Sequence, residues 1–212
     1  MRRVLFWRHG QTSWNGAGRF QGQTDIPLDL VGHEQARRAA ELLAGLRPDA
    51  ILSSDLGRTR QTAGYLGEAV GLTPGVDTRL RETYAGAWEG LTFAQIDEQF
   101  PQESAAWKTG AVEVRPGGGE NRLEVGSRVA EAVSQAVSEL DDDGLLIVVT
   151  HGGAIRSGLV AMLELPTEYW GILSGAGNCH WSVIEEQASG LNWRLTEHNA
   201  GSLPEPVVLQ EG

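Results

Sequence analysis

The strongest constraint on the fold is an apolar run at residues 145–149 that ends directly in Thr150-His151-Gly152-Gly153. A continuous apolar run of this length, bounded by glycine, is typical of a strand buried on both faces of a sheet. Two shorter runs follow the same plan. Residues 4–7 end in Arg8-His9-Gly10, and residues 50–52 end in Ser53-Ser54-Asp55. The chain therefore predicts three buried strands whose ends carry polar side chains.

Helical periodicity separates these runs. Apolar residues recur at helical spacing over residues 36–46, 59–70 and 120–140, and a further helix is predicted from Gly153 through Leu163. Two late strands are expected at 180–186 and 191–195, joined by a turn near Gly190. Strands that alternate with helices favour an α/β fold, here a three-layer sandwich with a mostly parallel central sheet flanked by helices.

The polar clusters that follow the three runs are expected to meet. Parallel sheets of this class bind ligands at the carboxyl ends of their strands. The clusters there contain two His-Gly pairs, at His9 and His151, together with Arg8 and Arg58. Arginine offers bidentate donors to an oxyanion, and histidine can serve as nucleophile or base. Such a set suits phosphoryl transfer, in which charge spreads over three oxygens.

Composition narrows the class of protein. The 212 residues suit a single domain over 1–212, and 41% hydrophobic residues with 21% charged residues are ordinary for a globular chain. A formal net charge of -11 makes nucleic acid or an anionic membrane an unfavourable partner. No targeting segment or membrane span is indicated. The lone Cys179 is compatible with a cytoplasmic location, and the chain from Leu203 is expected to be an irregular tail.

Several motifs resemble those of the histidine phosphatase superfamily, in the same order along the chain. They are Arg8-His9-Gly10-Gln11-Thr12-Ser13-Trp14-Asn15, Gln21-Gly22, Ser53-Ser54-Asp55-Leu56-Gly57-Arg58, Leu80-Arg81-Glu82, Gly86-Ala87-Trp88-Glu89-Gly90, Gly117-Gly118-Gly119-Glu120 and Thr150-His151-Gly152-Gly153. The resemblance implies the phosphoglycerate mutase-like fold. It also implies hydrolysis or transfer of a phosphoryl group through a phosphohistidine.

The resemblance assigns roles to the matching residues. His9 would be the nucleophile, and Arg8, Arg58 and His151 would hold the phosphoryl oxygens. The neighbouring guanidinium groups disfavour a cationic His9, whereas His151 is expected to face phosphate as a cation. Further contacts to the phosphoryl group would come from Asn15, Gln21 and the amide of Gly152.

Glu82 would be the general acid, first giving a proton to the leaving alcohol and later taking one from water. Glu89 is an alternative acid, for which a structural role is favoured. Weaker expectations concern residues outside the core motif. Arg19 would line the mouth of the site, Arg81 would pair with Glu82 or phosphate, and Glu120 would be a capping carboxylate or a hydrogen-bond partner of the site. Trp88 and Trp107 are candidate walls for a sugar, His180 is expected to be structural, and His33 and His198 are expected to be surface residues without partners.

A hydrolase is favoured over a mutase. Mutases of the family carry an arginine after the acid and a basic insertion later, whereas Glu82 is followed by Thr83-Tyr84-Ala85-Gly86. Residues 98–116 contain only Lys108 and Arg115 as cations. No cluster of His, Cys or acidic residues has metal-ligand spacing, so we expect no metal and no other cofactor. A non-catalytic phospho-ligand sensor and a metal-dependent hydrolase remain as alternatives.

Other stretches resemble the glucosyl-3-phosphoglycerate phosphatase family within the superfamily. They include Gln21-Gly22-Gln23-Thr24-Asp25, Val76-Asp77-Thr78-Arg79-Leu80-Arg81-Glu82-Thr83 and Gly177-Asn178. The implied substrate is a small phosphorylated sugar acid such as glucosyl-3-phosphoglycerate. A phosphoglycerate mutase or a broad sugar-phosphate phosphatase is the alternative. Many relatives dimerise, so the resemblance allows a homodimer, for which residues 166–177 are a candidate contact or a lid.

Overall fold

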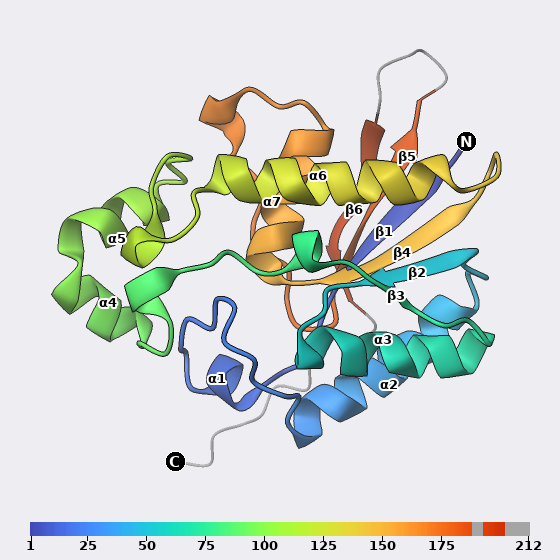
Figure 1. Cartoon of the computed structure of the whole chain (residues 1–212), viewed down its shortest axis with the longest axis horizontal. Helices are drawn as coiled ribbons and strands as arrows, with labels where there is room; N and C mark the ends of the chain where they lie inside the picture. Colours follow the sequence, from blue (N-terminus) through green and yellow to red (C-terminus); the bar gives the residue numbers. More distant parts are fainter. Residues whose placement is uncertain (188–192, 202–212) are drawn as a thin grey trace.

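The strands join in one six-stranded sheet in the computed structural model, which describes residues 1–187 and 193–201. The order across the sheet is β3-β2-β4-β1-β5-β6 (Figure 1). Strands β3, β2, β4 and β1 run parallel, whereas β5 is antiparallel to β1, and β6 to β5. This confirms the predicted mostly parallel sheet. The strands are β1 (Arg3–Arg8), β2 (Ala50–Ser53), β3 (Gly75–Val76), β4 (Leu145–Thr150), β5 (Trp181–Glu186) and β6 (Trp193–Ala200).

Helices cover both faces of the sheet and complete three layers. In Figure 1, α2 and α3 lie on one side, and α6 and α7 lie on the other. Two short helices, α4 and α5, extend beyond the sheet beside the amino-terminal end of α6. The helices are α1 (Ser13–Gly16), α2 (Leu30–Ala44), α3 (Gly57–Val70), α4 (Phe93–Gln99), α5 (Pro101–Lys108), α6 (Arg122–Ser138) and α7 (Gly152–Met162).

The alternation of side chains along β1 explains why the sheet has a core on each face. Val4 and Phe6 join the cluster beneath α6 and α7, while Leu5 and Trp7 join the cluster beneath α2 and α3. All four are at most 1% exposed. Successive strand residues point to opposite faces, so a strand buried on both faces is apolar throughout. This is the pattern from which the strand was predicted.

Several predicted boundaries change. Helix α2 begins at Leu30, because the Asp29 side chain caps it by accepting from the Gly32 N–H. Leu30 is 89% exposed, so the first turn contributes nothing to the apolar stripe that defined the prediction. Helix α3 ends where Gly71 adopts a left-handed conformation (φ 73°), as expected.

Other corrections fall at the end of the chain. Strand β6 continues to Ala200, five residues beyond the predicted end. The predicted turn at Gly190, the strand start at Leu191 and the tail from Leu203 lie outside the described residues.

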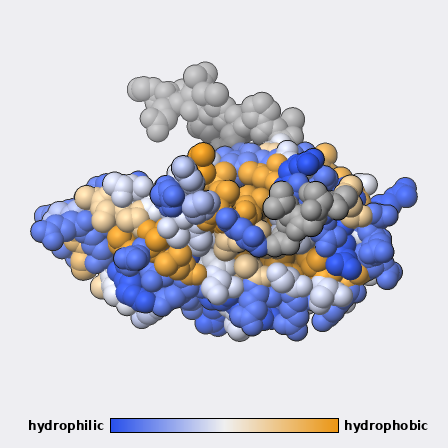
Figure 2. Space-filling view, turned by 90° about the horizontal axis from the view of Figure 1, so that it is seen from above, coloured by the Kyte–Doolittle hydropathy of each residue, from blue (hydrophilic) through white to orange (hydrophobic). Residues whose placement is uncertain are grey.

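Figure 2 shows the surface from above, mostly hydrophilic at its rim with hydrophobic residues gathered towards its centre. No helix in residues 1–187 and 193–201 has the length and apolar character that a membrane crossing requires. The exposed hydrophobic side chains include Tyr169 and Ile172, both in the candidate contact segment after α7. The last part of this segment lies against the end of β1, since the Ala176 carbonyl accepts a hydrogen bond from Arg8.

Candidate active site

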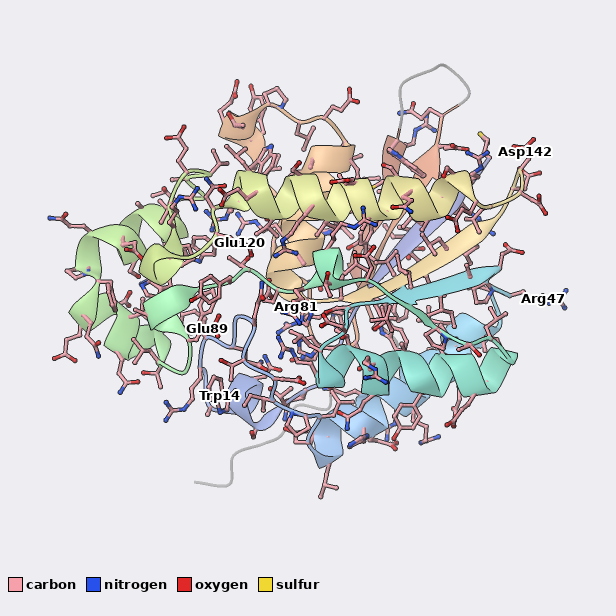
Figure 3. The ribbon with its side chains drawn as sticks, in the orientation of Figure 1. Trp14, Arg47, Arg81, Glu89, Glu120 and Asp142 are labelled. Atoms are coloured by element: carbon pink, nitrogen blue, oxygen red, sulfur yellow. The ribbon has the colours of Figure 1, made fainter. Side chains whose placement is uncertain are left out.

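The three polar clusters converge at the carboxyl edge of the parallel strands, as the sequence predicted. Arg8 at the end of β1 lies in register with Thr150 at the end of β4, and Val149 in turn pairs with Ser53 of β2. His9 follows β1, and its backbone N–H donates to the Thr150 carbonyl at 3.0 Å. In Figure 3, Arg81, Glu89 and Glu120 lie towards this edge of the sheet. Arg47 and Asp142 lie at the opposite end.

A cavity of about 310 Å³ lies at this edge. It is lined by Arg8, His9, Asn15, Gly18, Arg19, Phe20, Gln21, Gly22, Arg58, Glu82 and Phe93. Six predicted site residues therefore face one cavity, and Arg19 lines it as expected. His151 and Gly152 lie immediately beside it. The rings of His9 and His151 are 5.2 Å apart between centroids, and a Cβ at Gly152 would lie 3.4 Å from the Arg8 Nε.

His9 is held as a neutral ring with a defined tautomer. Its Nδ1 is 2.7 Å from the Gly10 carbonyl, which can only accept, so Nδ1 carries the proton and Nε2 keeps its lone pair. The ring is 2% exposed. Burial, together with the positive charges of Arg58 and Arg8, holds the pKa of His9 well below its usual value. An unprotonated Nε2 is the form that can attack phosphorus.

Arg58 is buried, and no carboxylate in residues 1–187 and 193–201 forms an ion pair with it. It belongs to the first turn of α3 and is fully buried. Its Nη1 and Nη2 each donate at 2.8 Å, to the carbonyls of Thr24 and Gly22. Burial lowers the pKa of Arg58 to about 10, so it stays cationic at neutral pH. Its charge is available to an anion in the cavity, because no acid in the described part of the chain is in direct contact to neutralise it.

His151 differs from the expectation of a cation. Arg58 Nε donates to its Nδ1 at 3.2 Å, which makes Nδ1 an acceptor, and Nε2 is 3.0 Å from the Ser54 Oγ. Burial, with the charges of Arg58 and other neighbours, holds the pKa of His151 well below its usual value. The ring is therefore neutral, because a buried cation beside Arg58 would be repelled. Ser54, which sequence analysis placed in a cluster without a role, is its hydrogen-bond partner.

Arg8 and Asn15 keep donors for a ligand. Arg8 Nη1 donates to the Ala176 carbonyl at 2.7 Å, and its buried Nε has no hydrogen-bond partner in the described part of the chain. Burial lowers the pKa of Arg8. The Asn15 Oδ1 accepts from Thr12 N and Oγ1 and from Asn178 Nδ2, which fixes the amide orientation. Within residues 1–187 and 193–201 the Asn15 Nδ2 makes no hydrogen bond, and the residue lines the cavity.

Glu82 is fixed at the amino terminus of α7. Its Oε1 accepts from Thr83 N at 2.8 Å and Ala154 N at 3.1 Å, and its Oε2 accepts from Gly153 N at 3.0 Å. A helix terminus presents free N–H groups of this kind. A Cβ at Gly153 would collide with the Glu82 carboxylate, so only glycine allows this approach. Glu82 lines the cavity, and Gln23 of the loop after Gln21 donates to its backbone carbonyl at 3.2 Å.

Glu89 supports the loop that holds Arg58, which agrees with the structural role favoured for it. Its carboxylate accepts from Gln23 N at 3.0 Å, Ala85 N at 3.1 Å and Thr24 Oγ1 at 2.6 Å. This ties the loop to the turn before α4. Arg81 corrects another expectation, since it pairs with Asp55 rather than with Glu82 or the cavity.

The structure also tests the expectations for five further side chains. Trp88 is 1% exposed inside an aromatic cluster, so it cannot be a wall of the cavity. Trp107 packs against the Arg122 guanidinium, 3.6 Å from the ring centroid. His33 contacts the Tyr65 hydroxyl, and His198 contacts Ser174 and Ser182, so neither lacks a partner. His180 contacts Asn199, consistent with a structural role.

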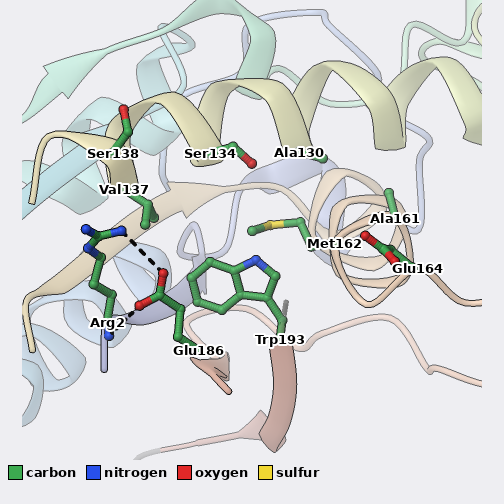
Figure 4. A pocket seen from close by; sticks show the side chains of 10 residues that line it. All are labelled: Arg2, Ala130, Ser134, Val137, Ser138, Ala161, Met162, Glu164, Glu186 and Trp193. Carbon is green, nitrogen blue, oxygen red and sulfur yellow. Dashed lines mark hydrogen bonds and ion pairs between the residues drawn. The ribbon is translucent and has the colours of Figure 1, made fainter. Parts of the chain in front are cut away.

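Another cavity, of about 420 Å³, lies away from this edge (Figure 4). It contains the Arg2–Glu186 ion pair, at 3.3 Å, together with Met162 and Trp193. None of the predicted site residues lines it. Within residues 1–187 and 193–201, no group of three or more His, Cys, Asp or Glu side chains is placed to hold a metal ion.

Comparison with known proteins decides the family. The model of the histidine phosphatase superfamily (branch 1) matches residues 4–200. The chain belongs to this superfamily. It is 40% identical to the glucosyl-3-phosphoglycerate phosphatase of Mycobacterium tuberculosis (strain CDC 1551 / Oshkosh), covering 98% of this chain and 99% of that relative. It is 34% identical to the probable phosphoglycerate mutase GpmB of Serratia proteamaculans, covering 89% and 87%.

Solved structures give the same result for the fold. The mycobacterial glucosyl-3-phosphoglycerate phosphatase Rv2419c in complex with VO3 superposes with a TM-score of 0.89 at 42% sequence identity. The match covers 95% of this chain and 100% of that one. The predicted α/β sandwich of the phosphoglycerate mutase-like type is therefore confirmed.

Proposed function

We propose that this protein is a metal-independent phosphatase that hydrolyses glucosyl-3-phosphoglycerate through a phosphohistidine on His9. The observation that carries the chemistry is the His9 ring, which is neutral and oriented by the Gly10 carbonyl so that Nε2 is the nucleophilic nitrogen. The substrate follows from the similarity to mycobacterial glucosyl-3-phosphoglycerate phosphatases, which extends over nearly the whole of both chains.

In the first half-reaction, the His9 Nε2 lone pair attacks phosphorus and the bond from phosphorus to the substrate oxygen breaks. Glu82 gives its proton to that oxygen, so the leaving group departs as an alcohol. Arg8 and Arg58 stabilise the charge that spreads over the phosphoryl oxygens. The Asn15 amide and the Gly152 N–H add neutral donors, and His151, whose Nε2 contacts Ser54, stays neutral beside them.

In the second half-reaction, a water oxygen attacks phosphorus and the bond from phosphorus to Nε2 breaks. Glu82, now a carboxylate, takes one proton from that water. The products are inorganic phosphate and the neutral His9 ring. Glu82 therefore acts as the acid in the first step and as the base in the second. The backbone N–H groups of Thr83, Gly153 and Ala154 hold its carboxylate in the same position in both steps.

Hydrolysis is favoured over mutase activity by where the cations of residues 98–116 lie. Lys108 pairs with Asp97 at 2.6 Å, and Arg115 pairs with Glu124 at 2.5 Å. Both cations are thus engaged with carboxylates rather than lining the cavity. The similarity to a named mutase is also lower than that to the phosphatases.

The test is phosphate release in the presence of EDTA from glucosyl-3-phosphoglycerate, 3-phosphoglycerate, sugar phosphates and p-nitrophenyl phosphate. We expect a strong preference for the glucosylated substrate and loss of turnover in His9→Ala. Base quenching during turnover should retain a phosphoprotein that acid quenching destroys, because the phosphorus–nitrogen bond is acid-labile. Dependence on a metal would overturn the mechanism, and equal weak activity on all substrates would overturn the assigned substrate.

A further inference from the structure

Arg128, on α6, places its whole guanidinium against the segment that carries Glu82. Its Nη1 donates to the carbonyls of Arg79 at 2.7 Å and Arg81 at 2.6 Å, and its Nη2 donates to the Glu82 carbonyl at 3.0 Å. Three carbonyls from a stretch of four residues thus converge on one cation. The side chain is 17% exposed and does not line the cavity.

Glu120 holds the opposite side of the same guanidinium. Arg128 Nε donates to Glu120 Oε1 at 2.9 Å, and Nη2 donates to Oε2 at 2.8 Å. Glu120 is also joined to Tyr84 twice, since Tyr84 N donates to Oε2 and Glu120 N donates to the Tyr84 carbonyl, both at 2.8 Å. The Arg128–Glu120 pair therefore binds the backbone on both sides of Glu82. Glu120 is not the cap of α6, a role taken by Asn121.

We propose that Arg128 is a positioning residue for proton transfer by Glu82. The inference rests on the proposed role of Glu82 as general acid. The Glu82 carboxylate is fixed by α7, and its backbone is fixed by Arg128 on α6. Helices α6 and α7 pack on the same face of the sheet and share one hydrophobic cluster. The two helices together set the distance from the carboxylate to the leaving oxygen.

Lysine cannot reproduce this arrangement, because an ammonium group lacks the planar fork that contacts three carbonyls and a carboxylate at once. Arg128→Lys keeps the charge and frees the backbone of residues 79–82. A small displacement of a catalytic group lowers the rate steeply. The loss should appear wherever the leaving group needs a proton.

The dependence of the rate on the leaving group distinguishes a positioning role from a merely structural one. An alkyl phosphate such as 3-phosphoglycerate releases a basic alkoxide and needs the general acid, whereas p-nitrophenyl phosphate releases a stable anion. We expect Arg128→Lys to lower kcat/KM, which reports the steps up to release of the leaving group, by about 10-fold or more for the alkyl phosphate and less than about 3-fold for p-nitrophenyl phosphate. Glu82→Gln should show the same selectivity, more strongly. Glu120→Gln, which weakens the pair, should show it to a smaller degree.

Arg37→Lys is the matched control, because Arg37 also pairs with glutamate, in its case Glu34 and Glu41, but lies exposed on α2. This variant should hydrolyse both substrates at the wild-type rates. In the Glu82→Gln background, Arg128→Lys should add no further leaving-group dependence, since both changes act on one proton transfer. Thermal unfolding of each variant separates loss of fold from loss of position, and Glu120→Gln tests the same pair if Arg128→Lys does not fold.

Equal losses of kcat/KM on both substrates, or additive losses of kcat/KM in the double variant, would overturn the positioning role. Because the alkyl phosphate can be any that the wild-type protein hydrolyses, this result is independent of the assigned substrate. Absence of hydrolysis by the wild-type protein would instead overturn the proposed function.

Discussion

Phe93 exposes 53% of its surface although it lines the cavity that contains His9. Its ring packs edge-on against Phe20, with centroids 6.2 Å apart, and this leaves ring surface open to a ligand. An open aromatic face beside a phosphate site can contact the apolar face of a sugar ring. Phe93 and Phe20 therefore take the place that sequence analysis gave to Trp88 and Trp107.

We predict that Phe93→Ala lowers kcat/KM for glucosyl-3-phosphoglycerate by about 5- to 10-fold, which corresponds to about 1 kcal/mol of lost aromatic contact. The value for 3-phosphoglycerate, which lacks the glucose ring, should change less than about 2-fold. Steady-state kinetics on the two substrates measure this. Tyr169→Ala, which removes a ring of similar exposure outside the cavity, is the control. Equal changes on both substrates would show that the glucose ring lies elsewhere.

The candidate site could be predicted where side-chain position follows from the backbone. His9, Arg8 and His151 belong to short motifs at strand ends, so the topology alone brings them close, whereas Glu82 was assigned from the family resemblance and follows a short turn rather than a strand. Arg128 gave no such signal, because it is one charged residue on a long amphipathic helix. Its partners come from a segment about 50 residues earlier in the chain. The direction taken by a long side chain depends on those partners and cannot be read from local spacing.

At the scale of elements, the loop after β1 and the start of α2 are in direct backbone contact. A Cβ on Gly32 would collide with the Gln11 carbonyl, and one on Gly10 would collide with the Gly32 carbonyl. The Gly32 N–H also donates to the Asp29 carboxylate at 2.8 Å. Helix α2 thus positions the loop that carries His9.

We predict that Gly32→Ala destabilises the protein by about 1–3 kcal/mol and lowers activity, because backbone atoms must move to admit the methyl group. Gly64→Ala is the matched control. Gly64 also lies inside a helix, α3, but a Cβ there meets nothing within 4 Å. The control should gain about 0.5–1 kcal/mol from higher helix propensity. Denaturant unfolding measures both, and a neutral Gly32→Ala would contradict the close contact.

The elements that could be predicted are those with an apolar pattern. Strands β1, β2 and β4 and helices α2, α3, α6 and α7 were all anticipated. Strand β3 was missed because Gly75 and Val76 are both exposed and only two residues pair. Helices α4 and α5 were missed for a similar reason, since each buries only one residue, Ile96 and Ser104. Their positions depend instead on capping by Thr92 and on the aromatic cluster around Trp88.

At the scale of the whole molecule, the site places two neutral histidines in the interior. His9 and His151 are 2% and 0% exposed, and burial holds the pKa of each well below its usual value. Unfolding restores an ordinary pKa of about 6.5. Below that pH the unfolded chain therefore binds up to two more protons than the folded chain, and these protons favour unfolding.

The sign follows from this difference. The free energy of unfolding rises with pH wherever the unfolded state holds more protons, so the two histidines destabilise the protein as pH falls below about 6.5 and have no effect above it. Each histidine contributes a slope of up to about 1.4 kcal/mol per pH unit.

We predict that between about pH 5 and 6.5 the slope of the unfolding free energy against pH is reduced in His9→Gln and in His151→Gln, by similar amounts. Asn15→Ala, which removes a neighbouring side chain that does not titrate, should keep the wild-type slope. Urea unfolding across this window measures it. An unchanged slope in both histidine variants would mean that the two rings titrate alike in the folded and unfolded protein, and would contradict the lowered pKa of His9 and His151.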